Sequence, residues 1–342
     1  MKRALKVALV SLVVLSIAAF ATAIWIGHYL HVPLRVERPV VFTVAPGSSF
    51  ATVTIQLAQQ GILRQPQVLS IYARVRGQAQ RIRAGEYEIR SGATPADLLE
   101  RLVRGDVLLR EVTIVEGWTV RDMLRALASS PYLEHTLEGV PLAQIMARLA
   151  QPDVHPEGQF FPDTYRFARG TSDIEVLRKA HEAMRSRLDS AWTSRDTSLS
   201  LPSPYQALIL ASLVEKESAL PAERARIAGV FVRRLRVGMR LQSDPTVIYG
   251  LGESYTGDIR TRDLHDDTPY NTYTRAGLPP TPIALPGAGS LQAATHPEDS
   301  GALFFVATGE TDGSHYFSAT LAEHDAAVKR YLARIRARGV AP

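Results

Sequence analysis

The feature that most constrains this chain is an uninterrupted apolar run near its N-terminus, residues 7–27 (VALVSLVVLSIAAFATAIWIG). About 20 residues without a charge are enough to cross the hydrocarbon core of a membrane as a helix. Three basic residues precede the run, and the first Lys or Arg after it is Arg35. The positive-inside rule therefore places residues 1–6 in the cytoplasm. We expect a single transmembrane anchor at 7–27, with the rest of the chain on the other side of the membrane.

A cleaved signal peptide is the alternative, because Ala21-Thr22-Ala23 has the small-x-small form of a cleavage site. The apolar run continues past this site, and Trp25 and Tyr29 are residue types that favour the membrane interface. Both observations favour an uncleaved anchor.

Composition excludes several classes of function. The chain has 342 residues, of which 46% are hydrophobic, so it can bury a substantial core. A net charge of +5 does not indicate nucleic-acid binding but is compatible with an anionic polymer or a membrane surface. The absence of cysteine excludes disulfides, thiol catalysis and thiolate metal sites. The nine histidines form no HExxH motif, and there is no P-loop or G-x-S-x-G elbow. We expect no metal, no cofactor and no nucleic-acid partner.

Beyond a short spacer at 28–39, one pattern occurs three times. A β-prone run, a glycine at its sixth position and an amphipathic helix begin at Phe42, Tyr87 and Val112, with glycines Gly47, Gly92 and Gly117. These small α+β units, at 40–150, resemble the LysM module, a peptidoglycan-binding fold. Units of this size are also common without that function, so glycan binding by them is left open. A mixed α+β domain is expected at 151–340, which makes the fold class α+β.

A buried helix with charges near one end is the main candidate for chemistry. Ser203 is a suitable N-cap and Pro204 a suitable first residue, and the helix is expected to end at about Leu220. It is apolar nearly all round, which is typical of burial inside a domain. Glu215 and Glu217 lie about 200° apart around it and cannot serve one site together. One should pair with Lys216 or a following arginine, or face solvent, and the spacing does not decide which.

Several long sequence segments indicate the function of this helix more clearly than the spacing of its glutamates. They are "EGQFFPDTYRF", "ASLVEKES", "RLRVGMRLQSDPTVIYGLG", "TPYNTYTRAGLPPTPIALPG" and "AATHPEDSGALFFVA". With them the chain resembles the endolytic murein transglycosylase (MltG, or YceG-like) family. The resemblance implies that Glu217, the second Glu of E-K-E, is the catalytic residue. Ser218, which follows it, is a candidate substrate-binding residue. The resemblance also implies a periplasm-facing enzyme of the inner membrane that cuts newly made peptidoglycan strands beside their synthases, the penicillin-binding proteins.

The implied reaction cleaves the β-1,4 bond between N-acetylmuramic acid and N-acetylglucosamine and leaves a 1,6-anhydro end. A single carboxyl suffices if the C6 hydroxyl of the muramic acid is the nucleophile. Apolar surroundings in the helix would raise the pKa of the Glu217 carboxyl, as general acid catalysis requires. Asp244 as a second carboxylate would allow hydrolysis instead. A non-catalytic wall-binding scaffold is the alternative from another class.

Two polar and aromatic clusters are candidates for the substrate cleft. They are Gln242, Ser243, Asp244 and Thr246, then Tyr270, Asn271, Thr272 and Tyr273. Amide and hydroxyl groups beside aromatic rings suit an N-acetyl sugar. The alternative is that these residues only cap and turn the chain. The aromatic residues of "PEGQFFPDTYRF" are likewise either a sugar-stacking platform or core.

Overall fold

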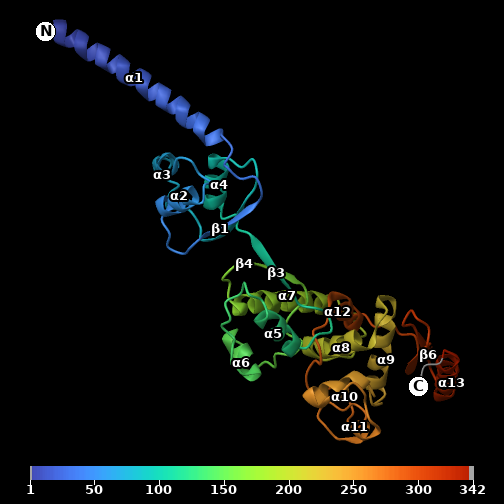
Figure 1. Cartoon of the computed structure of the whole chain (residues 1–342). Coiled ribbons are helices and arrows are strands. Elements are labelled where there is room, and N and C mark those ends of the chain that lie inside the picture. The colour runs from blue at the N-terminus through green and yellow to red at the C-terminus, as the bar shows by residue number, and fades with distance from the viewer. Residues whose placement is uncertain (1, 339–342) are drawn as a thin grey trace. The chain divides into compact units, whose positions relative to one another are not determined.

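The computed structural model describes residues 2–338, which form a mixed α+β chain with three two-stranded sheets (Figure 1). Its contacts divide the chain into two compact units. Unit 1 comprises the residues up to Arg110 together with Phe167–Gly170, and unit 2 comprises Glu111–Arg166 and the chain from Thr171 onward. Two of the three dividing points fall inside strands, because β3 (Leu109–Thr113) and β4 (Thr164–Ala168) each contribute residues to both units; the third follows Gly170.

Unit 1 packs helices against a two-stranded sheet. Its remaining elements are α1 (Lys2–His31), β1 (Val40–Val44), α2 (Phe50–Gln59), α3 (Pro66–Val75), β2 (Gly85–Ile89) and α4 (Pro95–Arg104). β1 pairs with β2 in antiparallel register, with Phe42 opposite Tyr87. Phe42 and Val44 are buried while Val41 is exposed, which is the alternation of a strand with one face on a core.

The N-terminal apolar run is helical, as predicted. α1 is one long helix (Figure 1), and its residues Leu5–His31 are long and apolar enough to cross a membrane. The hydrophobic side chains from Leu5 to Ile24 are exposed to the surroundings. This arrangement fits a membrane anchor and a signal sequence alike.

Residues 28–39, expected as a spacer, are instead integrated into unit 1. α1 continues to His31, and Leu30, Leu34 and Val36 are buried in the core formed by α2, α3, α4 and the sheet. The backbone N–H of Leu34 donates to the carbonyl of Ala93, at 2.8 Å. Three apolar side chains within seven residues therefore bury the segment despite its prolines.

The three predicted glycine turns have the same local structure. Gly47, Gly92 and Gly117 all have positive φ values, 76°, 82° and 79°, a conformation that costs little only for glycine. Two residues later an N-cap side chain, from Ser49, Thr94 or Thr119, accepts a hydrogen bond from the first turn of the following helix. The local pattern is thus set by the sequence at each of the three places.

Unit 2 contains most of the helices. Its elements besides β3 and β4 are α5 (Val120–Ala128), α6 (Leu142–Arg148), α7 (Asp173–Thr193), α8 (Pro204–Glu217), the 3₁₀ turn η1 (Pro221–Glu223), α9 (Arg224–Arg236), α10 (Asp244–Leu251), the 3₁₀ turn η2 (Gly252–Ser254), α11 (Thr261–His265), α12 (Ala288–Thr295), β5 (Phe304–Ala307), β6 (His315–Ser318) and α13 (Leu321–Ala337). β5 and β6 form an antiparallel hairpin.

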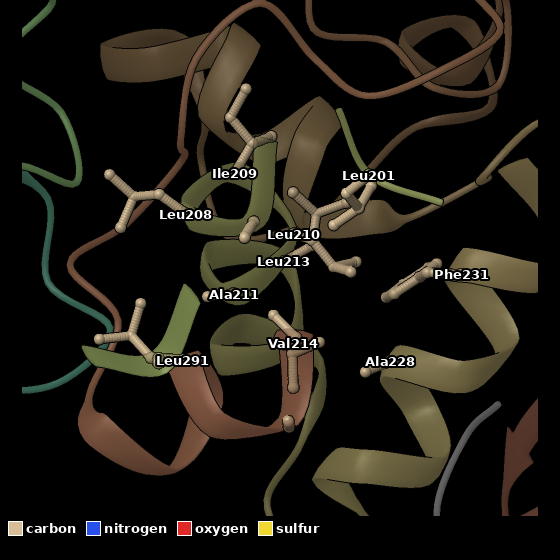
Figure 2. Packing of buried hydrophobic residues seen from close by; sticks show 14 of the residues in the cluster. Leu201, Leu208, Ile209, Leu210, Ala211, Leu213, Val214, Ala228, Phe231 and Leu291 are labelled. Atoms are coloured by element: carbon tan, nitrogen blue, oxygen red, sulfur yellow. The ribbon is translucent and has the colours of Figure 1, made fainter. Parts of the chain in front are cut away.

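The centre of unit 2 is α8, the helix that carries the two glutamates. Every residue from Ala207 to Val214 is buried, as the all-round apolar pattern predicts. Figure 2 shows Val214 directed toward Ala228 and Phe231 of α9, with Leu291 of α12 on another side. Residues 207–214 therefore offer no face on which a charge could meet solvent, and the exposed Lys216 lies in the last turn.

The third strand-glycine-helix segment belongs by its contacts to unit 2, so the chain divides at Arg110 and not near residue 150. The backbone of this segment is tied to the loop before α12, because Gly117 N donates to Leu285 O at 2.9 Å and Leu285 N to Trp118 O at 2.7 Å. The three segments thus share a strand-glycine-helix pattern, but the third packs in a different unit from the first two.

A substitution at Gly229 tests the packing of α9. A Cβ at this helical glycine would overlap the carbonyl oxygen of Glu298, whose N–H is held by Ala225 O at 2.9 Å. Because backbone cannot move aside easily, we expect Gly229→Ala to lower the free energy of unfolding by on the order of 3 kcal/mol. Denaturant unfolding followed by tryptophan fluorescence measures it. Gly27→Ala, with open space around its Cβ, is the control; because alanine favours a helix more than glycine does, it should be neutral or slightly stabilising. Equal stability of the two variants would contradict the packing argument.

Candidate active site

Glu217 is the last residue of α8, three residues before the predicted end of the helix. Ser218 is extended (φ −100°, ψ 112°), and its Oγ donates to Leu220 O at 2.7 Å. This side-chain hydrogen bond stabilises the non-helical conformation after Glu217, where the backbone hydrogen bonds of the helix end. Pro221 also disfavours helical geometry at Leu220. Glu217 therefore lies at the C-terminal end of α8, directly before the loop that leads to η1.

Glu215 is the structural glutamate of the pair. Its side chain is 5% exposed, and its carboxylate accepts hydrogen bonds from Arg224 Nη2 at 3.2 Å and from Gly287 N at 2.9 Å. The expected pairing with a following arginine is thus found in Arg224. A buried carboxylate with an ion pair and a backbone donor has its charge compensated.

Glu217 differs, because no described residue bonds a counter-charge to its carboxyl. It is half-buried, and Ser243 Oγ donates to its Oε1 at 2.5 Å. Burial raises the pKa of Glu217 above that of an ordinary glutamate, and the negative charge of Asp244 acts in the same direction. The hydrogen bond from Ser243 and the positive charges of His315 and Arg234 oppose this pKa rise. The net result favours the protonated carboxyl.

Ser243 and Asp244 begin α10 beside Glu217. Tyr273 Oη donates to Asp244 Oδ1 at 2.5 Å, and Asp244 is exposed. Gln242, the preceding residue, has φ +50°, a left-handed conformation that is uncommon outside glycine. Its N–H donates to Thr272 O at 3.1 Å. Strain of this kind is often found at functional sites.

Three of the expected cleft residues are buried and hold loops together: Thr246, Asn271 and Thr272. Thr272 Oγ1 accepts from Ser243 N at 3.0 Å and bonds Thr246 Oγ1 at 2.9 Å. Asn271 Nδ2 donates to three carbonyls of the segment 263–266, and its Oδ1 accepts from the N–H of Tyr273. The contacts of Thr246, Asn271 and Thr272 therefore fit the alternative in which they stabilise caps and turns of the chain.

Tyr270 and Ser218 are also engaged away from Glu217. Tyr270 Oη hydrogen-bonds Thr281 Oγ1 at 2.9 Å, and its ring packs edge-on against Tyr249 at 4.9 Å between centroids. Of the predicted site residues, the structure thus groups Ser243, Asp244 and Tyr273 around Glu217, with Gln242 next to them along the chain.

Two positively charged or ionisable neighbours of Glu217 were not predicted from the sequence. Arg234 is buried, and its guanidinium donates to Leu303 O at 2.7 Å and to Leu241 O at 2.6 Å. His315 Nδ1 lies 2.7 Å from Glu223 Oε2, which orients the ring. These residues come from α9 and β6, and no local pattern links them to Glu217.

A second buried carboxyl, Glu157, lies within "PEGQFF". It is 2% exposed; Oε1 accepts from Val120 N and Oε2 from Tyr249 Oη, both at 3.0 Å. Burial raises the pKa of Glu157 to about 7. Phe160, Phe161 and Phe167 of the same segment are also buried, whereas Tyr165 is half-buried. Burial of the three phenylalanines favours the core interpretation of this aromatic cluster over sugar stacking.

Across residues 2–338 no three His, Asp or Glu side chains are grouped as a metal site would require.

Comparison with known proteins assigns the family. The sequence profile of the YceG-like family matches residues 42–330, which is most of the chain. The protein belongs to the YceG-like family.

Named relatives agree with this assignment. A Bacillus subtilis (strain 168) protein named endolytic murein transglycosylase is 29% identical over 320 residues, 86% of each chain. A relative of the same name from Streptococcus pneumoniae serotype 2 is 27% identical over 330 residues; the match covers 86% of this chain and 59% of the relative. The crystal structure of a yceG-like protein from Listeria monocytogenes is similar with a TM-score of 0.53 at 29% identity, over 85% of this chain and 99% of that one.

The buried carboxyl of Glu157 predicts a pH-dependent stability. Its folded pKa of about 7 exceeds the ordinary 4.5, so the protonated form stabilises the fold below pH 4.5. That stability is lost as the pH rises to about 7, by at most about 3 kcal/mol. Glu157→Gln keeps a neutral side chain of the same shape. We therefore expect its stability relative to wild type to increase between pH 5 and pH 8 in denaturant unfolding; a constant difference would show that Glu157 does not titrate in this range.

Proposed function

We propose that this protein is an endolytic peptidoglycan lytic transglycosylase in which Glu217 is the catalytic residue. The observation that carries the proposal is the half-buried carboxyl of Glu217 at the C-terminal end of a helix whose residues 207–214 are all buried, with the neutral hydroxyl of Ser243 as its hydrogen-bond donor. Membership of the YceG-like family and relatives named endolytic murein transglycosylase support the same activity.

One carboxyl can perform both proton transfers. Protonated Glu217 donates to the glycosidic oxygen between N-acetylmuramic acid and N-acetylglucosamine, and the bond from C1 to that oxygen breaks. The C6 hydroxyl oxygen of the muramic acid then bonds to C1, and its proton passes to the Glu217 carboxylate. The acid is regenerated, and the product carries a 1,6-anhydro ring.

The surroundings suit the two protonation states in turn. Burial favours the protonated acid before cleavage, whereas Ser243 and the charges of Arg234 and His315 stabilise the carboxylate after it. Exposed Asp244, with its negative charge, would stabilise positive charge developing on the sugar. Gln242, Asp244 and Tyr273 are the proposed substrate contacts, since Thr246, Asn271 and Thr272 are occupied with loop bonds.

We also propose that α1 anchors the protein in the inner membrane, with its N-terminus in the cytoplasm and the rest in the periplasm. Acting there, it would terminate strands made by penicillin-binding proteins. LysM-like glycan binding by unit 1 is supported by a cavity of about 650 Å³ between the turn after β1 and the α3–β2 connection, where Ser48, Arg74 and Gln80 offer polar groups.

Products of Glu217→Gln test the reaction. The full chain in detergent, incubated with uncrosslinked glycan strands, should release fragments ending in 1,6-anhydro-muramic acid, detected by mass spectrometry. Because an amide cannot donate the proton, we expect the variant to lose activity by roughly 10²-fold or more.

Glu215→Gln is the matched control on the same helix. It weakens the ion pair with Arg224 and should lower stability more than activity per folded molecule. Reducing ends from the wild type would instead indicate hydrolysis with Asp244 as second carboxylate. Cleavage by Glu217→Gln at the wild-type rate would refute Glu217 as the catalytic residue. No cleavage by either protein would leave the non-catalytic wall-binding scaffold or a missing partner.

Ser243→Ala tests the proton on Glu217. Removing a donor to the carboxylate raises the pKa of Glu217 further, since that bond holds the pKa down in the wild type. Catalysis needs the protonated form, so activity falls above this pKa. The alkaline limb of kcat/KM against pH should therefore move to higher pH in the variant. Movement to lower pH, or none, would refute Glu217 as the acid.

A further inference from the structure

The junction between α1 and the rest of unit 1 is fixed by several bonds. Tyr29 Oη donates to Gln65 O at 2.9 Å, and Arg35 N donates to Ile62 O at 3.2 Å. Leu30 is buried in the same core as α2, α3 and α4. The last turns of α1 are therefore held against the segment 62–65 and do not move independently of it.

A cavity of about 220 Å³ lies at this junction, which we call the interfacial pocket. One wall is aromatic: Trp25 and Tyr29 stack with their ring centroids 6.2 Å apart, and Trp25 is 47% exposed. Arg35 and Arg64 are the charged residues of its lining, and both are exposed. Among the residues that the structure describes, no Asp or Glu lines the pocket, so the two arginines give its lining a positive charge.

The length of α1 sets the depth of this pocket if the helix spans the membrane as proposed. The apolar helical segment has 27 residues, which is about 40 Å of helix, whereas the hydrocarbon core is about 30 Å thick. The final turns from Trp25 then lie at the level of the lipid headgroups. Aromatic rings and arginines at that level match the polarity of the interface.

We propose that the interfacial pocket binds the phosphate headgroup of an anionic phospholipid, with Arg35 and Arg64 as its cationic ligands and an acyl chain along α1 beside Trp25. Charge complementarity selects an anionic lipid, because two guanidinium groups face no carboxylate in the pocket. The bound lipid would fix unit 1 against the membrane surface. This inference rests on the proposed membrane anchor and is independent of the chemistry at Glu217.

Native mass spectrometry of the full chain released from nanodiscs tests the pocket, with equal amounts of phosphatidylglycerol and phosphatidylcholine as the probe lipids. The wild type should retain phosphatidylglycerol preferentially. The double variant Arg35→Ala/Arg64→Ala should bind it more weakly by on the order of 10-fold or more. Trp25→Ala should also reduce retention although it changes no charge.

The control is Arg38→Ala/Arg81→Ala, which removes the same charge from exposed positions of unit 1 outside the pocket. An equal loss in this control, or equal retention of the two lipids by wild type, would overturn the proposal. Competition by glycerol phosphate would show a site for free phosphate and overturn the lipid assignment. A chain washed off membranes by alkali would overturn the anchor and the pocket together. Glycan cleavage in detergent should be unchanged in Arg35→Ala/Arg64→Ala, which separates failure here from failure of the proposed enzyme.

Discussion

Desolvation at the end of α8 is the constraint on which the site depends. The helix is enclosed by α9, α12 and the rest of the unit 2 core, so charged groups are confined to its C-terminal turn. There the two glutamates differ in their partners. Glu215 receives a guanidinium and a backbone N–H, whereas Glu217 receives one neutral hydroxyl. The same burial that makes an uncompensated carboxylate unfavourable makes its acid form available for proton donation.

The position of the Ser243 hydroxyl depends on hydrogen bonds between two loops, one containing Gln242 and Ser243 and the other containing Thr272. The N–H of Ser243 donates to Thr272 Oγ1, and Gln242 directly before it has a left-handed backbone conformation. Ser243 is thereby placed within hydrogen-bond distance of Glu217 at the end of α8. The helix that follows, α10, is fastened at Tyr249 to the buried carboxyl of Glu157, which in turn binds the start of α5. A hydrogen-bonded chain therefore connects the acid to a segment about a hundred residues earlier, and the geometry at Glu217 is a property of the whole of unit 2.

Local features of the structure could be predicted from the sequence. The caps at Ser203 and the three glycine turns depend on neighbouring residues alone, and the burial of α8 follows from its apolar pattern. The partners of the glutamates could not be predicted, because Arg224, Ser243, Arg234 and His315 are brought in by tertiary packing. The helix end at Glu217 depended on a bond between Ser218 and Leu220 that periodicity does not show. The boundary at Arg110 was missed for a similar reason, since three copies of one local pattern pack in two different units.

The integration of α1 into unit 1 has a consequence for proteolysis. A protease that cuts at Pro39 would remove Leu30, Leu34 and Val36, and with them three buried side chains of the core. Each lost side chain of this size costs about 2 kcal/mol or more, so the shed fragment would be prone to unfold and be degraded. A cut after Ala23 would leave all three in place. Soluble forms that persist must therefore begin upstream of Leu30.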